Sequence, residues 1–288
     1  MPTVGFVGIG IMGEPMAIRL LDQHPLIVFN RTHERAQGLS ERGAVVASRL
    51  SELGQACELV FLMLSDDQAV RSVVEGPNGL VKSLRPGTTI VDHSTISPKT
   101  TRALAERCAA IGVTWLDAPV TGGDGGARSG TLTIMVGGPR RAFEQVLPYL
   151  KLMGEHIVHV GVVGQGQTLK LVANMVSGIN LMAASEGLQL GLTLGLALPD
   201  LSLVLQNSSA SSYEVTKVID RVTRQDYQAG FSVKNRYKDL ELAREMAQQA
   251  GFALDLGLAG ERAFKEHLDA GFQSEDEVSY IKRWTESE

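Results

Sequence analysis

The segment Gly8-Ile9-Gly10-Ile11-Met12-Gly13 constrains the fold more than any other stretch. It follows a predicted strand at residues 3–7 and opens a predicted helix with Pro15 in its first turn. A second predicted strand ends about twenty residues later, at Asn30. In this context the glycine pattern predicts a dinucleotide-binding βαβ unit, although alone it matches many glycine-rich turns. Gly8 and Gly10 allow the backbone to approach a pyrophosphate at the helix N-terminus, and Gly13 allows close helix packing.

Short β-branched runs alternate with amphipathic segments from residue 3 to about residue 160. The predicted strands are residues 3–7, 26–30, 44–46, 59–64, 89–92, 113–118, 132–136 and 156–160. Helix-like segments such as 16–21, 34–42 and 99–111 lie between them. This alternation predicts an α/β fold with a parallel, doubly wound Rossmann-type sheet.

The pattern changes after a glycine-rich turn at residues 161–166. An apolar run over residues 169–198 predicts a long buried helix, which Thr168 could cap and Pro199 would end. The remaining helical patterns cover residues 199–206, 213–223, 233–250, 256–270 and 274–284. We therefore predict two domains: a cofactor-binding domain at residues 1–162 and an all-helical substrate and dimerisation domain at 163–288.

Lys170 is the only cation in the long apolar run, and Asn174 follows four residues later. On a helix these two side chains project from one face, where an ammonium and a carboxamide could bind one small polar ligand. The alternative is a lysine that extends from a core helix to solvent beside an ordinary asparagine. This segment alone does not decide between the two.

The end of the second strand bears on the choice of cofactor. NAD sites usually present Asp or Glu to the ribose hydroxyls, whereas this chain has Asn30-Arg31-Thr32. The change removes a repelling carboxylate and offers a guanidinium to a 2′-phosphate, so we favour NADP over NAD. The alternative is a surface arginine followed by a threonine that caps the next helix.

Three more loops leave predicted strands at the carboxyl edge of the sheet, where doubly wound folds bind ligands. They are Met63-Leu64-Ser65, His93-Ser94-Thr95 and Thr121-Gly122-Gly123. Thr121 and the two glycine amides would form a small anion nest suited to a carboxylate. Each serine or threonine could equally be an ordinary cap or turn residue. The shared position of the three loops at one edge favours the functional interpretation.

Composition excludes several classes of protein. With 27 Lys+Arg against 32 Asp+Glu, the net charge of −5 gives no footprint for nucleic acid or an anionic membrane. Cys57 and Cys108 are too few for a disulfide framework or a zinc cluster, and no signal-peptide pattern opens the chain. We expect a cytoplasmic protein without a metal. Polar residues interrupt the long apolar run, so we expect no membrane span.

Taken together, these blocks resemble the β-hydroxyacid dehydrogenase family, which includes 3-hydroxyisobutyrate dehydrogenase, tartronate semialdehyde reductase and the glyoxylate/succinic semialdehyde reductases. The resemblance extends over nearly the whole chain, in order. It rests on residues 8–13, Asn30-Arg31-Thr32, Asp92-His93-Ser94-Thr95, residues 117–123, residues 164–174 and Lys238-Asp239. The family implies a Rossmann-type domain joined by a long helix to an all-helical domain, with that helix helping to form dimers or tetramers.

The resemblance also implies roles for individual residues. Lys170 matches the catalytic lysine and Asn174 the substrate-orienting asparagine. Substrate contacts are expected from Ser94, Thr121, Gly122, Gly123, Lys170 and Asn174. Cofactor contacts are expected from Gly8, Ile9, Gly10, Ile11, Met12, Gly13, Asn30, Arg31, Thr32, Met63, Leu64, Ser65, Thr95, Phe231 and Lys238. Thr121 stands where the family more often has serine, and His93 is unusual in its block and takes no role from the family.

The expected activity is NADP-dependent interconversion of a small 3-hydroxy carboxylate and its semialdehyde. Hydride transfer builds alkoxide character on oxygen, so Lys170 would donate a proton in reduction and accept one in oxidation if its pKa is lowered. Candidate substrates are tartronate semialdehyde, glyoxylate, succinic semialdehyde and 3-hydroxyisobutyrate, and the serine-rich segment 206–213 is a candidate pocket wall. A homodimer or homotetramer is expected.

Three alternatives remain open. His93 could be the acid/base, as histidine is in some other dehydrogenases. The chain could be a nucleotide-sensing homologue that binds NADP without turnover, although an ammonium in an apolar helix is costly to keep without a use. It could also resemble imine reductases, which share the architecture but typically lack the lysine. The related 6-phosphogluconate dehydrogenases need a much longer helical region than this chain has.

Overall fold

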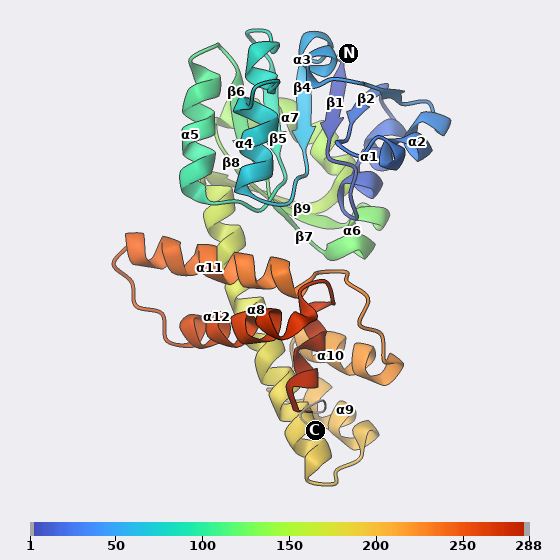
Figure 1. The fold of residues 1–288 in the computed structure, drawn as a ribbon, viewed down its shortest axis with the longest axis vertical. Helices are drawn as coiled ribbons and strands as arrows, with labels where there is room; N and C mark the ends of the chain where they lie inside the picture. Colours follow the sequence, from blue (N-terminus) through green and yellow to red (C-terminus); the bar gives the residue numbers. More distant parts are fainter. Residues whose placement is uncertain (1–2, 285–288) are drawn as a thin grey trace. The chain divides into compact units, whose positions relative to one another are not determined.

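The computed structural model describes residues 3–284, which form two compact units, residues 3–170 and 171–284. Unit 1 contains β1 (Val4–Val7), α1 (Gly13–Leu21), β2 (Leu26–Phe29), α2 (Glu34–Glu41), β3 (Val45–Val46), α3 (Leu50–Ala56), β4 (Leu59–Leu62), α4 (Asp67–Glu75), η1 (Leu80–Lys82), β5 (Thr89–Asp92), α5 (Pro98–Ala109), β6 (Thr114–Asp117), β7 (Val120–Thr121), α6 (Gly123–Ser129), β8 (Leu132–Gly137), α7 (Arg140–Met153) and β9 (Gly154–Gly161). Helix α8 (Gln165–Thr193) begins in unit 1 and continues into unit 2. Unit 2 also contains α9 (Leu198–Gln206), α10 (Tyr213–Arg224), α11 (Val233–Gln249), α12 (Leu256–His267), η2 (Leu268–Phe272) and η3 (Glu277–Trp284) (Figure 1).

Unit 1 is built on one sheet with the order β3-β2-β1-β4-β5-β6-β8-β7, and β9 pairs with β8. The first six strands in this order are parallel. The predicted Rossmann-type α/β fold is confirmed.

The sheet is not parallel throughout, which corrects one expectation. Strand β8 runs antiparallel to β6 and β7 and parallel to β9. One antiparallel register links Asp117 to Gly137 and Thr121 to Thr133. Strand β7 was absent from the predicted strands, because Val120–Thr121 is too short to show alternation.

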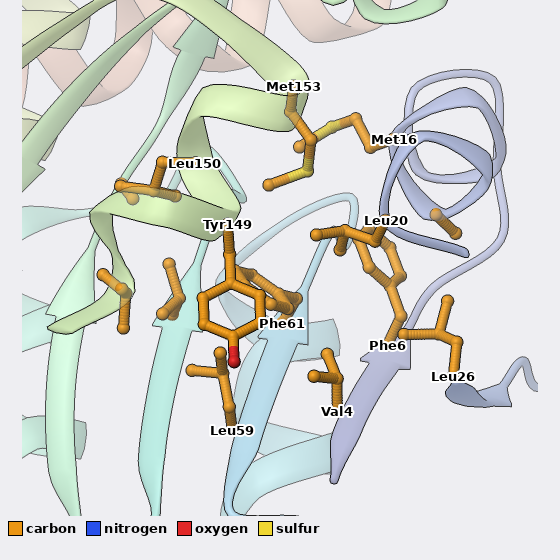
Figure 2. Close-up of a cluster of buried hydrophobic side chains, with 14 of the residues drawn as sticks. Val4, Phe6, Met16, Leu20, Leu26, Leu59, Phe61, Tyr149, Leu150 and Met153 are labelled. Atoms are coloured by element: carbon orange, nitrogen blue, oxygen red, sulfur yellow. The ribbon is translucent and has the colours of Figure 1, made fainter. Parts of the chain in front are cut away.

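Strand residues alternate between two cores, one on each face of the sheet. Phe6 and Phe61 lie in the core that α1, α2 and α7 cover. Val7 and Leu62, the next residues along these strands, lie in the core that α3, α4 and α5 cover. Figure 2 shows the first core, where Tyr149 from α7 lies beside Phe61, with a distance of 6.4 Å between ring centroids. Buried positions on both faces explain why the sequence reads as short apolar runs.

Unit 2 is helical in its described residues, as predicted. Its core is formed by α8, α10, α11, α12 and η3, with Leu181, Val218 and Phe264 among its fully buried side chains. Helix α8 ends at Thr193 and not at residue 198, because Gly195 adopts a left-handed φ of 83°. Pro199 therefore lies in the first turn of α9 and does not end α8. Among residues 3–284, no helix is both long and apolar enough to cross a membrane.

Candidate functional site

A different structural reason accounts for glycine at each of the three glycine positions in the loop after β1. Gly8 has φ 100°, and a Cβ on it would lie 2.2 Å from the carbonyl oxygen of Met63. A Cβ on Gly13 would lie 1.9 Å from the oxygen of Gly8, so α1 could not begin so close to β1 with any other residue. A Cβ on Gly10 would have no neighbour within 4 Å. The backbone at Gly10 is therefore open to a ligand at the N-terminus of α1, and this geometry suits a pyrophosphate.

The remaining loop residues differ in exposure. Ile9 is buried, Met12 is partly buried and Ile11 is 57% exposed. Ile11 is therefore the apolar side chain of this loop that a bound ligand could cover.

Asn30 holds the glycine loop in place. Its Oδ1 accepts a hydrogen bond from Ile9 N at 2.9 Å, and its Nδ2 donates to the oxygen of Thr32 at 2.8 Å. Arg31 and Thr32 are exposed beside it. His33 and not Thr32 occupies the N-cap position of α2, and it makes no capping hydrogen bond. The exposed Arg31 thus follows the carboxyl end of β2, with no carboxylate at position 30.

The loops after β4 and β5 are bonded to each other. Leu64 N donates to Ser94 Oγ at 2.9 Å, and Met63 N donates to the oxygen of Val7 at 2.9 Å. Ser94 is fully buried, so its placement favours a role in joining these loops over contact with substrate. Ser65 is exposed and donates to Asp66, which is the N-cap of α4. Thr95 is partly buried at the same edge.

His93 is packed inside the sheet edge. Its ring stacks on Phe61 at 5.6 Å and 2°, and its Nδ1 lies 2.6 Å from the oxygen of Ala118. Burial lowers the pKa of His93 to about 4. Its Nε2 is buried and has no hydrogen-bond partner among the described residues. The neutral imidazole is therefore a core group, which does not favour it as the acid/base.

Two buried carboxyl groups lie side by side at the ends of β5 and β6, where Asp92 pairs with Asp117 in the register. Asp117 Oδ1 accepts from Gly164 N at 2.7 Å, and its Oδ2 accepts from Gln167 N at 2.9 Å. Burial raises the pKa of Asp117, although these backbone donors oppose the shift. Asp117 thus caps the N-terminus of α8, whereas the sequence analysis gave Thr168 as the possible cap.

Gln167 completes this junction. It is fully buried, its Nε2 donates to the oxygen of Ser94 at 2.7 Å, and its Oε1 accepts from Ile96 N at 3.2 Å. Sequence reasoning assigned no role to Asp117 or Gln167. A polar residue at a strand end and a glutamine among glycines were the signals that could have identified them.

Thr121, Gly122 and Gly123 are exposed where β7 meets α6. Gly122 has φ 126° and Gly123 has φ 63°, both in the region that favours glycine. Successive amides in such a turn can converge on an anion. The geometry suits a substrate carboxylate.

Lys170 lies on α8 at the end of unit 1 and is 6% exposed. It lies within two turns of the helix N-terminus that Asp117 and Gln167 attach to the sheet. Its ammonium group is therefore held on a helix whose start is fixed.

The predicted site residues of unit 2 lie on α8 and α11, and just before α11. Asn174 is buried, and its Nδ2 donates to Asp239 Oδ2 at 2.5 Å. Lys238 is partly buried, and its Nζ lies 3.2 Å from Asp239 Oδ1. Phe231 is partly buried, with the guanidinium carbon of Arg236 5.0 Å from its ring centroid. The buried Asp239 and Arg236 were not among the predicted site residues.

The serine-rich segment 206–213 forms turn and cap structure. Ser208 Oγ accepts from Ala210 N at 3.3 Å, and Ser212 Oγ accepts from Val215 N at 3.2 Å as the N-cap of α10. These contacts explain the hydroxyl groups without a ligand, so a role in the pocket wall stays a prediction.

The fold and these sites match known proteins over nearly the full chain. Residues 3–161 match the family model described as the NAD binding domain of 6-phosphogluconate dehydrogenase. Residues 164–284 match the model described as NAD-binding of NADP-dependent 3-hydroxyisobutyrate dehydrogenase. These models cover the loops after β1, β2, β4 and β5 in unit 1 and all the predicted site residues of unit 2.

Individual relatives agree. The chain is 38% identical over 283 residues to 3-hydroxyisobutyrate dehydrogenase of Pseudomonas aeruginosa, covering 96% of this chain and 95% of that protein. It is 33% identical to 2-(hydroxymethyl)glutarate dehydrogenase of Eubacterium barkeri, covering 98% and 94%. A solved structure of Psf3 in complex with NADP+ and 2-OPP superposes with a TM-score of 0.92 at 31% identity, covering 98% and 99%. With this coverage and the cofactor loop in place, the chain belongs to the β-hydroxyacid dehydrogenase family.

Proposed function

We propose that this protein is an NADP-dependent oxidoreductase that interconverts a small 3-hydroxy carboxylate and its semialdehyde. The observation that carries the proposal is the buried Lys170, the only cation of α8, on the helix that also bears Asn174. A lysine ammonium on a helix of fixed position can act as a positioned proton donor and acceptor. The substrates named for two relatives, 3-hydroxyisobutyrate and 2-(hydroxymethyl)glutarate, are both 3-hydroxy acids.

Each residue has a part in the proposed chemistry. Bound NADPH would supply the hydride. Lys170 would donate a proton to the carbonyl oxygen during reduction and accept it during oxidation. Asn174 gives one N–H to Asp239 and would use its second N–H to hold the substrate oxygen. The amides of Gly122 and Gly123, with the Thr121 hydroxyl, would bind the substrate carboxylate.

The substitution Lys170→Ala tests the proposal directly. Turnover should fall at least about a hundredfold, because a positioned acid/base contributes that much, while NADPH binding stays nearly intact. Steady-state kinetics and NADPH fluorescence titration measure the two effects. Lys151→Ala, which alters an exposed lysine of α7, is the matched control. Near-normal turnover in Lys170→Ala would remove the assignment.

His93→Gln tests the rival acid/base in the same assay. Because the imidazole is buried against Phe61, turnover per folded molecule should change less than about tenfold. A loss as large as that of Lys170→Ala would transfer the role to His93.

The preference for NADP rests on Arg31. Arg31→Ala should raise the KM for NADPH about tenfold or more, because a charge-assisted hydrogen bond contributes about 1.5–3 kcal/mol. The KM for NADH should not change, because NADH has no 2′-phosphate. Arg42→Ala, just after α2, is the control. Equal effects on both cofactors would show that Arg31 does not select NADP.

A panel of small acids and aldehydes separates the remaining alternatives. It contains tartronate semialdehyde, glyoxylate, succinic semialdehyde, 3-hydroxyisobutyrate and a cyclic imine, each with NADPH or NADP+. Binding of NADPH without oxidation by any member favours a sensing homologue, whereas turnover of the imine alone favours an imine reductase.

We also propose a homo-oligomer, with the second copy of the chain covering α9 and the end of α8. None of the residues of α9 is buried, although Leu and Val make up much of it. Leu190, Leu194, Leu203 and Val204 are all more than half exposed. Isolated apolar side chains on a surface are normal, but a cluster of this kind marks an interaction site.

The domain bounds and the cellular location stay predictions. We predict a cofactor-binding domain at residues 1–162, a substrate and dimerisation domain at residues 163–288, and a cytoplasmic location.

A further inference from the structure

Arg236 of α11 is a charged side chain inside unit 2 that the proposed chemistry does not use. It is 3% exposed. Its Nε donates to the carboxylate of Glu277, which is 1% exposed, and its Nη2 donates to Ser177 Oγ at 2.9 Å. Its Nη1 donates to the backbone oxygen of Asn174. One guanidinium thus joins η3 to two positions of α8.

The charge of this arginine is balanced inside the unit. Glu277 also accepts a hydrogen bond from Lys217 of α10. Burial would raise the pKa of Glu277, but Arg236 and Lys217 outweigh it and lower the pKa, so the carboxylate stays ionised. A planar fork that is anchored at Nε has little freedom to rotate, so the direction of its Nη groups is fixed.

The surface of α8 provides room for this fork. A Cβ on Gly178, one turn after Asn174, would lie 3.1 Å from Arg236 Cδ and 3.5 Å from its Nη1. Most side chains at position 178 would therefore displace the guanidinium. The guanidinium carbon of Arg236 also lies 5.0 Å from the ring centroid of Phe231, a distance suited to a cation–π contact.

Asn174 is consequently held by α11 at two atoms. Asp239, three residues after Arg236 on the same helix, accepts from the side-chain amide of Asn174. Arg236 binds its backbone oxygen, which has a second lone pair besides the one used within the helix. One contact orients the side chain, and the other fixes the position of α8 at that residue.

We infer that Arg236, anchored by Glu277, is a positioning residue that holds Asn174 and Phe231 in register with each other. The inference rests on the proposed function, in which Asn174 orients the substrate, and on the cofactor contact that the family resemblance predicts for Phe231. A displacement of about 1 Å in a group that orients a substrate can cost about a hundredfold in rate.

Two variants separate positioning from stability. Arg236→Lys keeps a charge for Glu277 but loses the fork that reaches Asn174 and Ser177. Arg236→Met combined with Glu277→Gln removes both charges, so that no carboxylate is left buried and unpaired. Arg244→Gln is the matched control, because Arg244 lies on the same helix and pairs with Glu261 of α12 at 2.9 Å.

Kinetics at a temperature where each variant is folded give the first measurement. Arg236→Lys should lower kcat/KM about tenfold to a hundredfold, with a raised substrate KM, while its melting temperature stays near that of Arg244→Gln. A purely structural arginine would instead give a lower melting temperature with normal kcat and KM for the folded fraction, and this result would overturn the inference.

The second measurement does not depend on activity. The side-chain amide of Asn174 gives one pair of 15N–1H cross-peaks that share a nitrogen resonance, identified by their loss in Asn174→Asp. They should shift in Arg236→Lys and in the double variant, and stay unchanged in Arg244→Gln. Unchanged cross-peaks in the Arg236 variants overturn the inference. A wild-type protein that turns over no member of the panel contradicts the proposed function, and the cross-peaks alone then decide the inference.

Discussion

The carboxyl group of Asp92 is fully buried at the end of β5. Its Oδ1 accepts from Ser94 N at 3.0 Å, while its Oδ2 has no hydrogen-bond partner among the described residues. Burial, supported by the nearby Asp117 and Asp67, raises the pKa of Asp92 to about 7, although the bonds from Ser94 oppose the shift. The proton on this carboxyl is therefore linked to folding.

The sign of this linkage gives a prediction for Asp92→Asn. Between the unfolded pKa of about 4 and the folded pKa of about 7, the folded state holds the extra proton. The free energy of unfolding therefore falls as pH rises through this window, by up to about 1.4 kcal/mol per pH unit from this group. Asp92→Asn should remove this contribution to the pH dependence. The stability of the variant relative to the wild type should therefore rise as the pH increases toward and above 7. Urea unfolding from pH 4 to 8 measures it, and parallel curves for the two proteins would contradict the assignment.

At the scale of single elements, α8 depends on a carboxylate that is distant in sequence. Asp117 precedes Gly164 by 47 residues and supplies acceptors for two backbone N–H groups at the start of the helix. A carboxylate at this position accepts hydrogen bonds from N–H groups that have no partner within the helix. Its negative charge also interacts favourably with the positive end of the helix dipole. Lys170 lies one turn beyond Gln167, so this cap fixes the start of the segment that bears the proposed acid/base.

Asp117→Asn tests the cap. The amide keeps one acceptor but turns an N–H group toward a buried donor, so unfolding should become easier by about 2 kcal/mol or more. Chemical denaturation measures the change. Asp124→Asn breaks a partly exposed pair with Arg128 and should cost less than about 1 kcal/mol. Equal costs for the two substitutions would show that Asp117 is not an essential cap.

At the scale of the whole molecule, unit 1 buries the two cores of its sheet, unit 2 buries a third core, and α8 belongs in part to each unit. Leu198, Leu201 and Leu205 of α9 pack against the core of unit 2, whereas Leu190, Leu194, Leu203 and Val204 are exposed. A second copy of the chain is the partner that we propose for this surface.

Leu194→Glu combined with Leu203→Glu tests the assembly. Light scattering should give the mass of a dimer or tetramer for the wild type and of a monomer for the double variant, because two charges would be buried without partners. Val45→Glu, at an exposed position of β3, should keep the wild-type mass. A monomeric wild type would contradict the proposed oligomer.

Local patterns predicted much of this organisation because their physical causes are local. Glycines at 8, 10 and 13 reflect backbone conformation and close approach, which depend on a few neighbouring residues. Strand and helix periodicity then predicted every strand except the two-residue β7. The site residues proposed for the cofactor loop follow from the same local logic, and their roles remain to be tested.

The amino-acid sequence by itself determined the order of the strands other than β7, the glycine turn after β1 and the Lys170–Asn174 spacing, because each depends on residues close together in the chain. Only the tertiary structure decided that β8 runs antiparallel to β6, that Asp117 caps α8, and that Arg236 binds Asn174. These features join residues tens of positions apart. They arise when buried donors and acceptors find partners during folding, which no local pattern records.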